Sequence, residues 1–276
     1  MRVSATRTLV LIPVAIALNI ALGSTVQQAL KLPIYLDSVG TVITGVLAGP
    51  LAGLVTGVLT NLIWAYVLPP PLAAPTAGPF AITAAVIGLL AGLWGRLGLF
   101  RSRRAAEAPV LLGAVGAAVA VAILVAYTVT RAYSSTDAFK NVTGGGPQAL
   151  GPSELAFGAV VLVFIGLAAW ALVARRDAGA VAALGAGLLT GLVAAVVSAP
   201  IAAFVFGGVT GSGTDLLVAG FRAAGANLYQ ATLQQGLLSD PLDKMITALL
   251  VFLVVAAMPR RVVARFPNGE RLVESV

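Results

Sequence analysis

The polar residues that could do chemistry in this sequence are few, and they lie between long apolar runs. They gather in three stretches, residues 31–38, 69–79 and 207–244. A polar side chain inside an apolar helix bundle is costly, so each one that faces the interior is a candidate for function. We therefore expect these three stretches to meet around a binding site.

Asn61 and Trp64 are one helical turn apart within an apolar run and therefore share a helix face. An asparagine in an apolar helix needs a partner, either on another helix or in a substrate. Trp64 either belongs to the aromatic belt at a membrane interface or stacks on a ligand. An inward amide below an aromatic ring suits a planar, polar small molecule.

A row of uncharged amides lies in the third polar stretch. Residues 216–238 alternate as an amphipathic helix, with Asn227, Gln230, Gln234 and Gln235 on the polar side, the first three of them at helical spacing. Amides bind neutral or amphoteric ligands through paired donors and acceptors. The alternative is a helix that lies on the membrane surface.

The acidic candidates stand next to predicted helix starts. Asp37 and Asp243 each follow a leucine and precede an apolar run, where they either cap a helix or accept hydrogen bonds from a ligand. Asp240, Asp243 and Lys244 surround Pro241 at one such start. They form either an internal Asp–Lys pair that holds a loop or a direct ligand contact.

The composition excludes most enzyme chemistry. Cysteine and histidine are absent, which removes disulfides, thiolate and imidazole metal ligands, and every Ser–His or Cys–His catalytic arrangement. The glycine-rich residues 207–215 lack the Gly-Lys-Ser/Thr ending of a phosphate-binding loop and predict a flexible hinge, with Thr214 or Asp215 capping the next helix. We expect no enzyme activity, no catalytic residue, no metal and no cofactor.

The elements that must position these residues are membrane helices. Of 276 residues, 59% are hydrophobic and 10% charged, against about 25% charged in soluble domains. A spanning helix needs about 20 mostly apolar residues. We predict an all-α, polytopic membrane bundle in one integral membrane domain, with about eight transmembrane helices at 8–24, 38–49 (a short one), 51–68, 80–98, 109–129, 154–174, 179–206 and 242–258.

The arginines predict the orientation of the bundle. If eight spans alternate, one side receives Arg2, Arg7, Arg96, Arg101, Arg103, Arg104, Arg175, Arg176, Arg260, Arg261, Arg265 and Arg271. By the positive-inside rule, both termini then lie in the cytoplasm of a bacterial cell, with the chain in its cell membrane. The net charge of +7 is this topology signal and not a nucleic-acid footprint, since no basic patch is interleaved with aromatic residues.

Several strings in the chain resemble the substrate-binding S component of energy-coupling factor (ECF) transporters. They are residues 32–41, 51–62, 205–215, 239–244 and 259–267. The resemblance implies a six-helix core, here residues 8–100 and 179–267, to which this chain adds an inserted helical pair at about 105–178. It also implies that the loops 25–37, 69–79 and 207–241 bind a vitamin or related micronutrient from outside.

The family has no ATPase of its own, so the resemblance implies three partner chains. These are a membrane T component and two cytoplasmic ATPases, and the S component topples within the lipid bilayer to release its cargo. The family's docking surface is a small-xxx-small pattern on the first helix, which Ala17 and Ala21 match, with Ala15 nearby. Internal packing in an alanine-rich chain is the alternative explanation.

The sequence therefore predicts a substrate-capture subunit that binds a vitamin-like, nucleobase-like or nucleoside-like molecule. The expected contacts are Tyr35, Asp37, Asn61, Trp64, Asn227, Gln230, Gln234, Asp240, Asp243 and Lys244. Two alternatives stay open. A stand-alone secondary transporter would fit the similar strings at 53–57 and 191–195, and a membrane sensor or assembly protein would bind no cargo.

Overall fold

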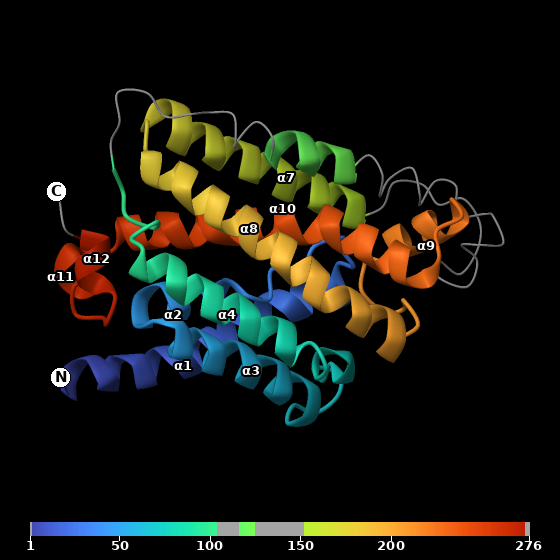
Figure 1. The fold of residues 1–276 in the computed structure, drawn as a ribbon, viewed down its shortest axis with the longest axis horizontal. Helices are drawn as coiled ribbons and strands as arrows, with labels where there is room; N and C mark the ends of the chain where they lie inside the picture. Colours follow the sequence, from blue (N-terminus) through green and yellow to red (C-terminus); the bar gives the residue numbers. More distant parts are fainter. Residues whose placement is uncertain (1, 104–115, 125–151, 274–276) are drawn as a thin grey trace.

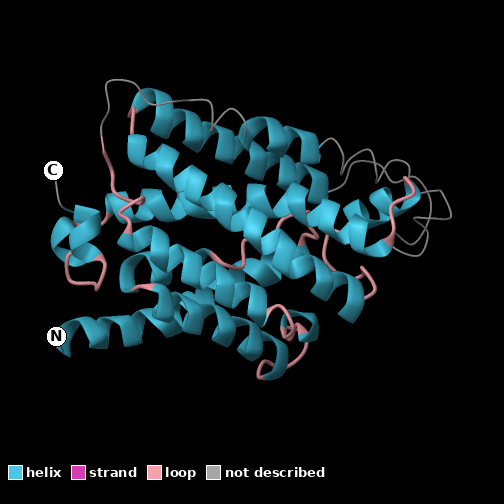
Figure 2. Ribbon diagram, viewed as in Figure 1, coloured by secondary structure: helices cyan, strands magenta, loops and turns pink. Residues whose placement is uncertain are grey.

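The computed structural model describes residues 2–103, 116–124 and 152–273, and this part of the chain consists of helices joined by loops, with no strand (Figure 2). Its helices are α1 (Arg2–Gly23), α2 (Val39–Ala48), α3 (Pro50–Tyr66), α4 (Ala81–Arg96), α7 (Pro152–Ala169), α8 (Ala178–Pro200), α9 (Asp215–Ala223), α10 (Leu228–Ala257), α11 (Arg260–Val263) and α12 (Gly269–Val273). Short π-helical turns continue α1, α7 and α8 to Ala29, Ala174 and Val205. The predicted all-α class is confirmed.

Three of these helices are long and apolar enough to cross a membrane. They are Thr6–Ala29, Leu155–Ala174 and Ala178–Val205. The helices α2, α3 and α4 are apolar but shorter, and α2 covers only about 15 Å at 1.5 Å per residue. It ends at Gly49, whose φ of 99° favours glycine, and Pro50 then begins α3. Of the predicted span 109–129, only residues 116–124 are described, and they are helical.

Helix α10 begins much earlier than the sequence indicated. The predicted span 242–258 is the second half of a helix that starts at Leu228. Its start is set by a capping box, in which the Asn227 side chain accepts from the Gln230 amide at 2.9 Å and the Gln230 side chain accepts from the Asn227 amide at 3.1 Å. The amphipathic stretch 216–238 is therefore two helices, α9 and the beginning of α10.

Pro241 lies inside α10 and does not end the helix. A proline in a helix removes one backbone hydrogen bond, so the surrounding packing has to hold the chain in place. The backbone of α8 supplies that packing, because a Cβ on Gly191 would lie only 2.4 Å from Cα of Pro241. Asp240, Asp243 and Lys244 are thus in mid-helix, and their predicted place at a helix start is wrong.

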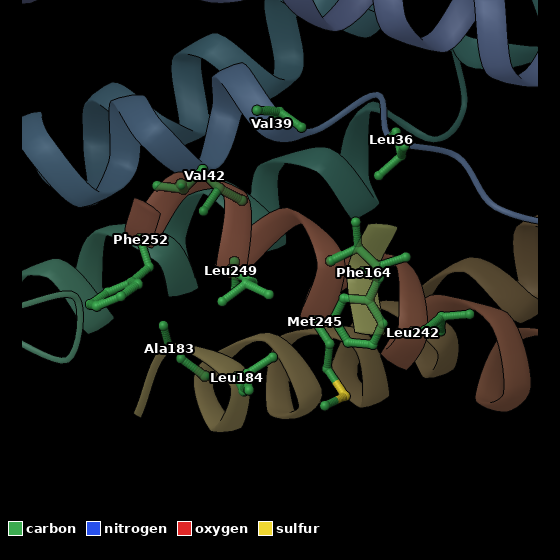
Figure 3. Packing of buried hydrophobic residues seen from close by; sticks show 14 of the residues in the cluster. Leu36, Val39, Val42, Phe164, Ala183, Leu184, Leu242, Met245, Leu249 and Phe252 are labelled. Carbon is green, nitrogen blue, oxygen red and sulfur yellow. The ribbon is translucent and has the colours of Figure 1, made fainter. Parts of the chain in front are cut away.

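Helix α10 is the centre of the bundle. It runs between α7 and α8 on one side and the group α1–α4 on the other (Figure 1). Its buried residues Leu242, Met245, Leu249 and Phe252 form the middle of the apolar cluster, with Ala183 and Leu184 of α8, Phe164 of α7 and Val42 of α2 around them (Figure 3). The polar side chains in the middle of α10, Asp240, Asp243 and Lys244, are therefore held within the interior.

The group α1–α4 is joined by close backbone contacts and by one buried amide. Gly53 of α3 and Gly88 of α4 cross so closely that a Cβ on Gly53 would lie 2.4 Å from the Gly88 carbonyl oxygen. Asn19 of α1 is fully buried. Its amide nitrogen donates to the hydroxyls of Thr41 (2.9 Å) and Thr60 (3.1 Å), and its oxygen accepts from the backbone N–H of residue 40 (2.6 Å).

The two ends of the bundle differ in charge. Both marked termini, the helices α11 and α12, and the C-terminal end of α10 lie at one end (Figure 1). In the described chain, that end carries Arg7, Arg96, Arg101, Arg103, Arg175, Arg176, Arg260, Arg261, Arg265 and Arg271, next to the helix termini that meet there. The loop after α3 and helix α9 lie at the opposite end.

Candidate binding cavity

A cavity of about 310 Å³ lies among the loops at the end away from the termini. Its walls include residues from the three predicted polar stretches together with α3, α4, α8 and α10. Six of the predicted site residues border it, namely Tyr35, Asp37, Asn61, Trp64, Asp240 and Lys244. The volume is at the lower end of the range for small-molecule pockets, about 300–1,000 Å³.

A buried ion pair on α10 holds the first loop. Lys244 Nζ donates to the Asp243 carboxylate and to Ser38 Oγ (2.8 Å). The other Asp243 oxygen accepts from the backbone N–H groups of Tyr35 (3.1 Å) and Leu36 (2.7 Å). The predicted Asp–Lys pair that holds a loop is present. Asp243 is buried behind the wall and does not border the cavity.

Tyr35 joins the first loop to the third stretch across the cavity. Its hydroxyl donates to Thr214 Oγ1 (3.2 Å) and accepts from Gln235 Nε2 (3.3 Å). Burial, assisted by the negative charge of Asp240, raises the pKa of Tyr35 well above its usual value, so the phenol stays a neutral hydrogen-bonding group.

Gln235 belongs to the predicted amide row but was not among the expected ligand contacts, which included its neighbour Gln234 instead. The signal for it was the row Gln235, Ser239, Asp243 at a spacing of four, which places three polar groups on one face of α10. All three are buried.

The glycine-rich segment 207–215 is a closed loop and not a free hinge. The Asp215 carboxylate accepts from the backbone N–H groups of Thr210 (3.0 Å) and Gly211 (2.7 Å) and from Thr210 Oγ1 (2.8 Å). The Asp215 side chain therefore folds back on the glycine-rich segment. No side chain caps the start of α9 with a hydrogen bond. Burial raises the pKa of Asp215, while these hydrogen bonds act in the opposite direction.

The first loop and the glycine loop touch at the mouth of the cavity. Lys31 Nζ donates to the Gly211 carbonyl oxygen. A Cβ on Gly213 would lie 1.9 Å from the Lys31 carbonyl oxygen, so only glycine fits at this contact. Lys31 and Leu36 both have positive φ values, 52° and 51°, which bend the loop sharply over the cavity. We call residues 31–36 and 210–214 the mouth loops.

Besides Asp215, two carboxylates border the cavity, and neither forms a salt bridge within the described chain. Asp37 accepts from Gln27 Nε2 at 2.9 Å, and Asp240 accepts one long hydrogen bond, 3.3 Å, from Ser198 Oγ. Asp240 is 5% exposed. Burial raises the pKa of Asp37, with the nearby Asp243 adding to the shift and Lys244 opposing it.

Asn61 and Trp64 border the cavity on the same face of α3, as their spacing predicted. Trp64 is 2% exposed, and its indole N–H donates to the Leu72 carbonyl oxygen at 2.9 Å. It therefore lies inside the protein and not in an interfacial belt. The Asn61 amide donates to the Gly57 carbonyl oxygen of its own helix at 3.2 Å.

Three members of the amide row do not reach the cavity. Asn227 and Gln230 are exposed at the start of α10, where they cap the helix and satisfy each other. Gln234 is exposed on the outer face of that helix. The row is therefore not a shared ligand surface, because α10 starts at Leu228 and turns Gln235, not Gln234, inward to the cavity.

The three candidate docking alanines on α1 separate into two groups. Ala15 is 2% exposed and packs on α2, where a Cβ on Gly40 would lie 2.1 Å from the Ala15 carbonyl oxygen. It is therefore an internal packing residue. Ala17 and Ala21 are exposed and continue an outward row that begins with Val10 and Val14.

No protein-family model matches the chain, and no curated protein or solved structure is significantly similar to it. What can be said of its activity therefore rests on the cavity and on the arrangement of the helices around it.

Proposed function

We propose that this chain is the substrate-capture membrane subunit of an ECF-type importer and that the cavity is its binding site. The observation that carries the proposal is the cavity of about 310 Å³, enclosed by three loops that are far apart in the sequence. Its walls combine aromatic rings with buried amides and carboxylates, as a site for a small polar molecule requires. In this proposal the chain delivers its cargo together with a T component and two ATPases.

The distribution of arginines supports an outward-facing cavity. Arginines gather at the end of the bundle that carries both termini, and the cavity lies at the other end. Under the positive-inside rule the arginine-rich end is cytoplasmic. The proposal thus places the protein in a bacterial cell membrane as a multi-pass chain with its cavity open to the outside.

The mouth loops support capture of a ligand. They meet through the Lys31–Gly211 hydrogen bond and the Tyr35–Thr214 hydrogen bond, which together cover the cavity. A ligand has to enter by separating them and is enclosed when they return. This device suits a subunit that holds its cargo until a partner releases it.

The binding test is native mass spectrometry of the gently purified protein, looking for a retained small molecule. Asn61→Leu keeps the side-chain volume but removes an amide from the cavity wall, so we expect the retained molecule to be lost. Leu62→Ala is the matched control, because Leu62 is the next residue of α3 and faces outward. Retention that is equal in both variants, or absent from the unmodified chain, contradicts the proposal.

The docking test uses the outward row on α1. Small residues four apart let another helix approach closely, so tryptophan at Ala17 and Ala21 should block a T component by its bulk. We expect the Ala17→Trp, Ala21→Trp double variant to lose co-purification with a co-expressed T component and two ATPases, while it still retains its cargo. Normal assembly of that variant would show that α1 is not the docking helix.

A stand-alone secondary transporter is the second candidate, and the ionisable residues inside α10 favour it. Asp240, Asp243 and Lys244 are buried in the middle of the central helix, and such residues often serve ion-coupled transport. Uptake by the purified chain alone in proteoliposomes, driven by an ion gradient, would support this function over the first. Uptake only in the presence of ATPases would exclude it.

A further inference from the structure

The cavity contains more negative than positive charge, and the imbalance lies in its inner half. Five charged side chains border it, namely Lys31, Asp37, Asp215, Asp240 and Lys244. Lys31 and Asp215 belong to the mouth, where their opposite charges interact. Deeper inside, Lys244 is the single cation among the described residues, and it interacts with Asp37, Asp240 and Asp243 together.

The charge of Lys244 is already used within the wall. Its ammonium binds Asp243 and Ser38, and Asp243 is saturated further by two backbone N–H groups of the first loop. This leaves the carboxylates of Asp37 and Asp240, which accept one side-chain hydrogen bond each, from Gln27 and Ser198. A carboxylate has about four acceptor positions, so both retain unused lone pairs.

A third polar group with unused hydrogen-bonding capacity lies in the same wall. Thr83 of α4 borders the cavity and is 7% exposed, and within the described chain its hydroxyl has no hydrogen-bond partner. Threonine in a helix usually donates to the carbonyl four residues earlier, so an unpaired buried hydroxyl needs an explanation. A polar ligand in the cavity would supply the missing partner.

From these observations we infer that the cavity selects a small organic cation, a flat ring that carries an ammonium or amidinium group. The cationic group binds the free oxygens of Asp37 and Asp240 through charge-assisted hydrogen bonds. The rings of Trp64 and Phe80, which also border the cavity, flank the flat part of the ligand. This inference rests on the proposed function, because it names the ligand class of the same cavity.

The energetic reason is that buried carboxylates without a matching cation are costly in a low-dielectric interior. A cationic ligand compensates the negative charge of these carboxylates. A neutral isostere leaves that charge uncompensated, and an anion adds to it. Selection by charge therefore follows from the walls themselves and does not depend on the ring that the ligand carries.

The test uses three probes that share a ring and differ in charge, namely benzylammonium, benzyl alcohol and benzoate. Binding to the purified full-length protein in detergent is measured by calorimetry and by the shift in Tm at millimolar probe. We expect benzylammonium to bind at least about tenfold more tightly than benzyl alcohol, because charge-assisted hydrogen bonds are roughly twice as strong as neutral ones. We expect no binding of benzoate.

Two variants assign the preference to the cavity. Asp240→Asn keeps the shape but removes the charge, so the affinity ratio between benzylammonium and benzyl alcohol should fall about tenfold, towards one. Glu270→Gln removes a carboxylate from the exposed surface at the opposite end and should leave the ratio unchanged. The Tm of each variant without probe shows that it is folded.

The outcomes separate the inference from the proposed function. Equal binding of benzylammonium and benzyl alcohol, or a ratio that survives Asp240→Asn, overturns the cation inference and leaves ligand capture intact. If none of the three probes binds at millimolar concentration, the cation inference fails, and the capture function is decided by the retained molecule in native mass spectrometry.

Discussion

At the scale of single residues, the ion pair of Asp243 and Lys244 has the largest structural role. Both side chains are almost completely buried, and together they hold Ser38 and the backbone of Tyr35 and Leu36 against α10. Burying two charges is costly, and the cost is offset only when each charge is paired and hydrogen-bonded. The loop that covers the cavity therefore depends on the pair being complete.

We predict that removing one partner of this ion pair lowers the free energy of unfolding more than removing both partners. Asp243→Asn keeps an oxygen for the loop amides but leaves Lys244 as an unpaired buried cation, and it should destabilise the protein by about 3–5 kcal/mol. Adding Lys244→Met removes the uncompensated charge and should recover a large part of that loss. The measurement is unfolding in mild detergent for both single variants and the double variant. A double variant as unstable as the sum of the singles would refute the coupling.

At the scale of elements, the mouth loops are the part most sensitive to added volume. Gly213 has no room for a Cβ because the Lys31 carbonyl oxygen occupies that position, and a backbone atom has little freedom to move away. Gly158 of α7 has nothing within 4 Å of the same position. The two glycines therefore form a matched pair, one at the mouth and one on an open helix face.

We predict that Gly213→Ala opens the mouth loops. Because the chain contains no cysteine, Thr83→Cys provides a single thiol in the cavity wall whose reaction with a maleimide reports access from outside. The labelling rate should rise at least about tenfold when Gly213→Ala is added, as expected if opening becomes easier by about 1.4 kcal/mol. Gly158→Ala should leave the rate unchanged. Equal labelling rates of Thr83→Cys with and without Gly213→Ala would mean that the mouth loops do not control entry to the cavity.

The elements also show what the sequence can and cannot predict. Apolar runs located α3, α4 and α8 to within a few residues, because the length of an apolar stretch is a local property. The start of α10 was missed although its capping box is visible as Asn227 and Gln230, since the same amides also fit a binding surface. Pro241 and the charges around it then suggested a helix start that does not exist.

The sequence predicted which residues lie together where one helix face decided it, and it missed the contacts between distant segments. Asn61 and Trp64 border the cavity together because one helical turn separates them. The contact of Tyr35 with Gln235 and the bonds from the first loop to Asp243 join residues about 200 positions apart, and no local pattern specifies them. Such pairs follow from the packing of α10 in the centre of the bundle.

At the scale of the whole molecule, the polarity of the bundle unites the fold and the proposed function. Arginines surround the helix termini at one end, where Asn268 also fastens the C-terminal segment to α2 by donating to the Val46 carbonyl oxygen at 3.0 Å. The mouth loops and the cavity are at the other end. A capture subunit requires this separation, because its cargo arrives on one side of the membrane and its ATPases act on the other.

The orientation gives the last prediction, which again uses the absence of cysteine. Ala224→Cys places a thiol on an exposed residue at the end of α9, and Ala264→Cys places one on an exposed residue among the arginines that follow α10. In right-side-out membrane vesicles, a membrane-impermeant maleimide should label Ala224→Cys at once and Ala264→Cys only after the vesicles are opened, because basic segments stay on the cytoplasmic side. The reverse pattern would put the cavity in the cytoplasm, where a capture subunit cannot meet its cargo. Labelling of both thiols in sealed vesicles would mean that the two ends are not on opposite sides of a membrane, and the proposed import function would then lose its basis.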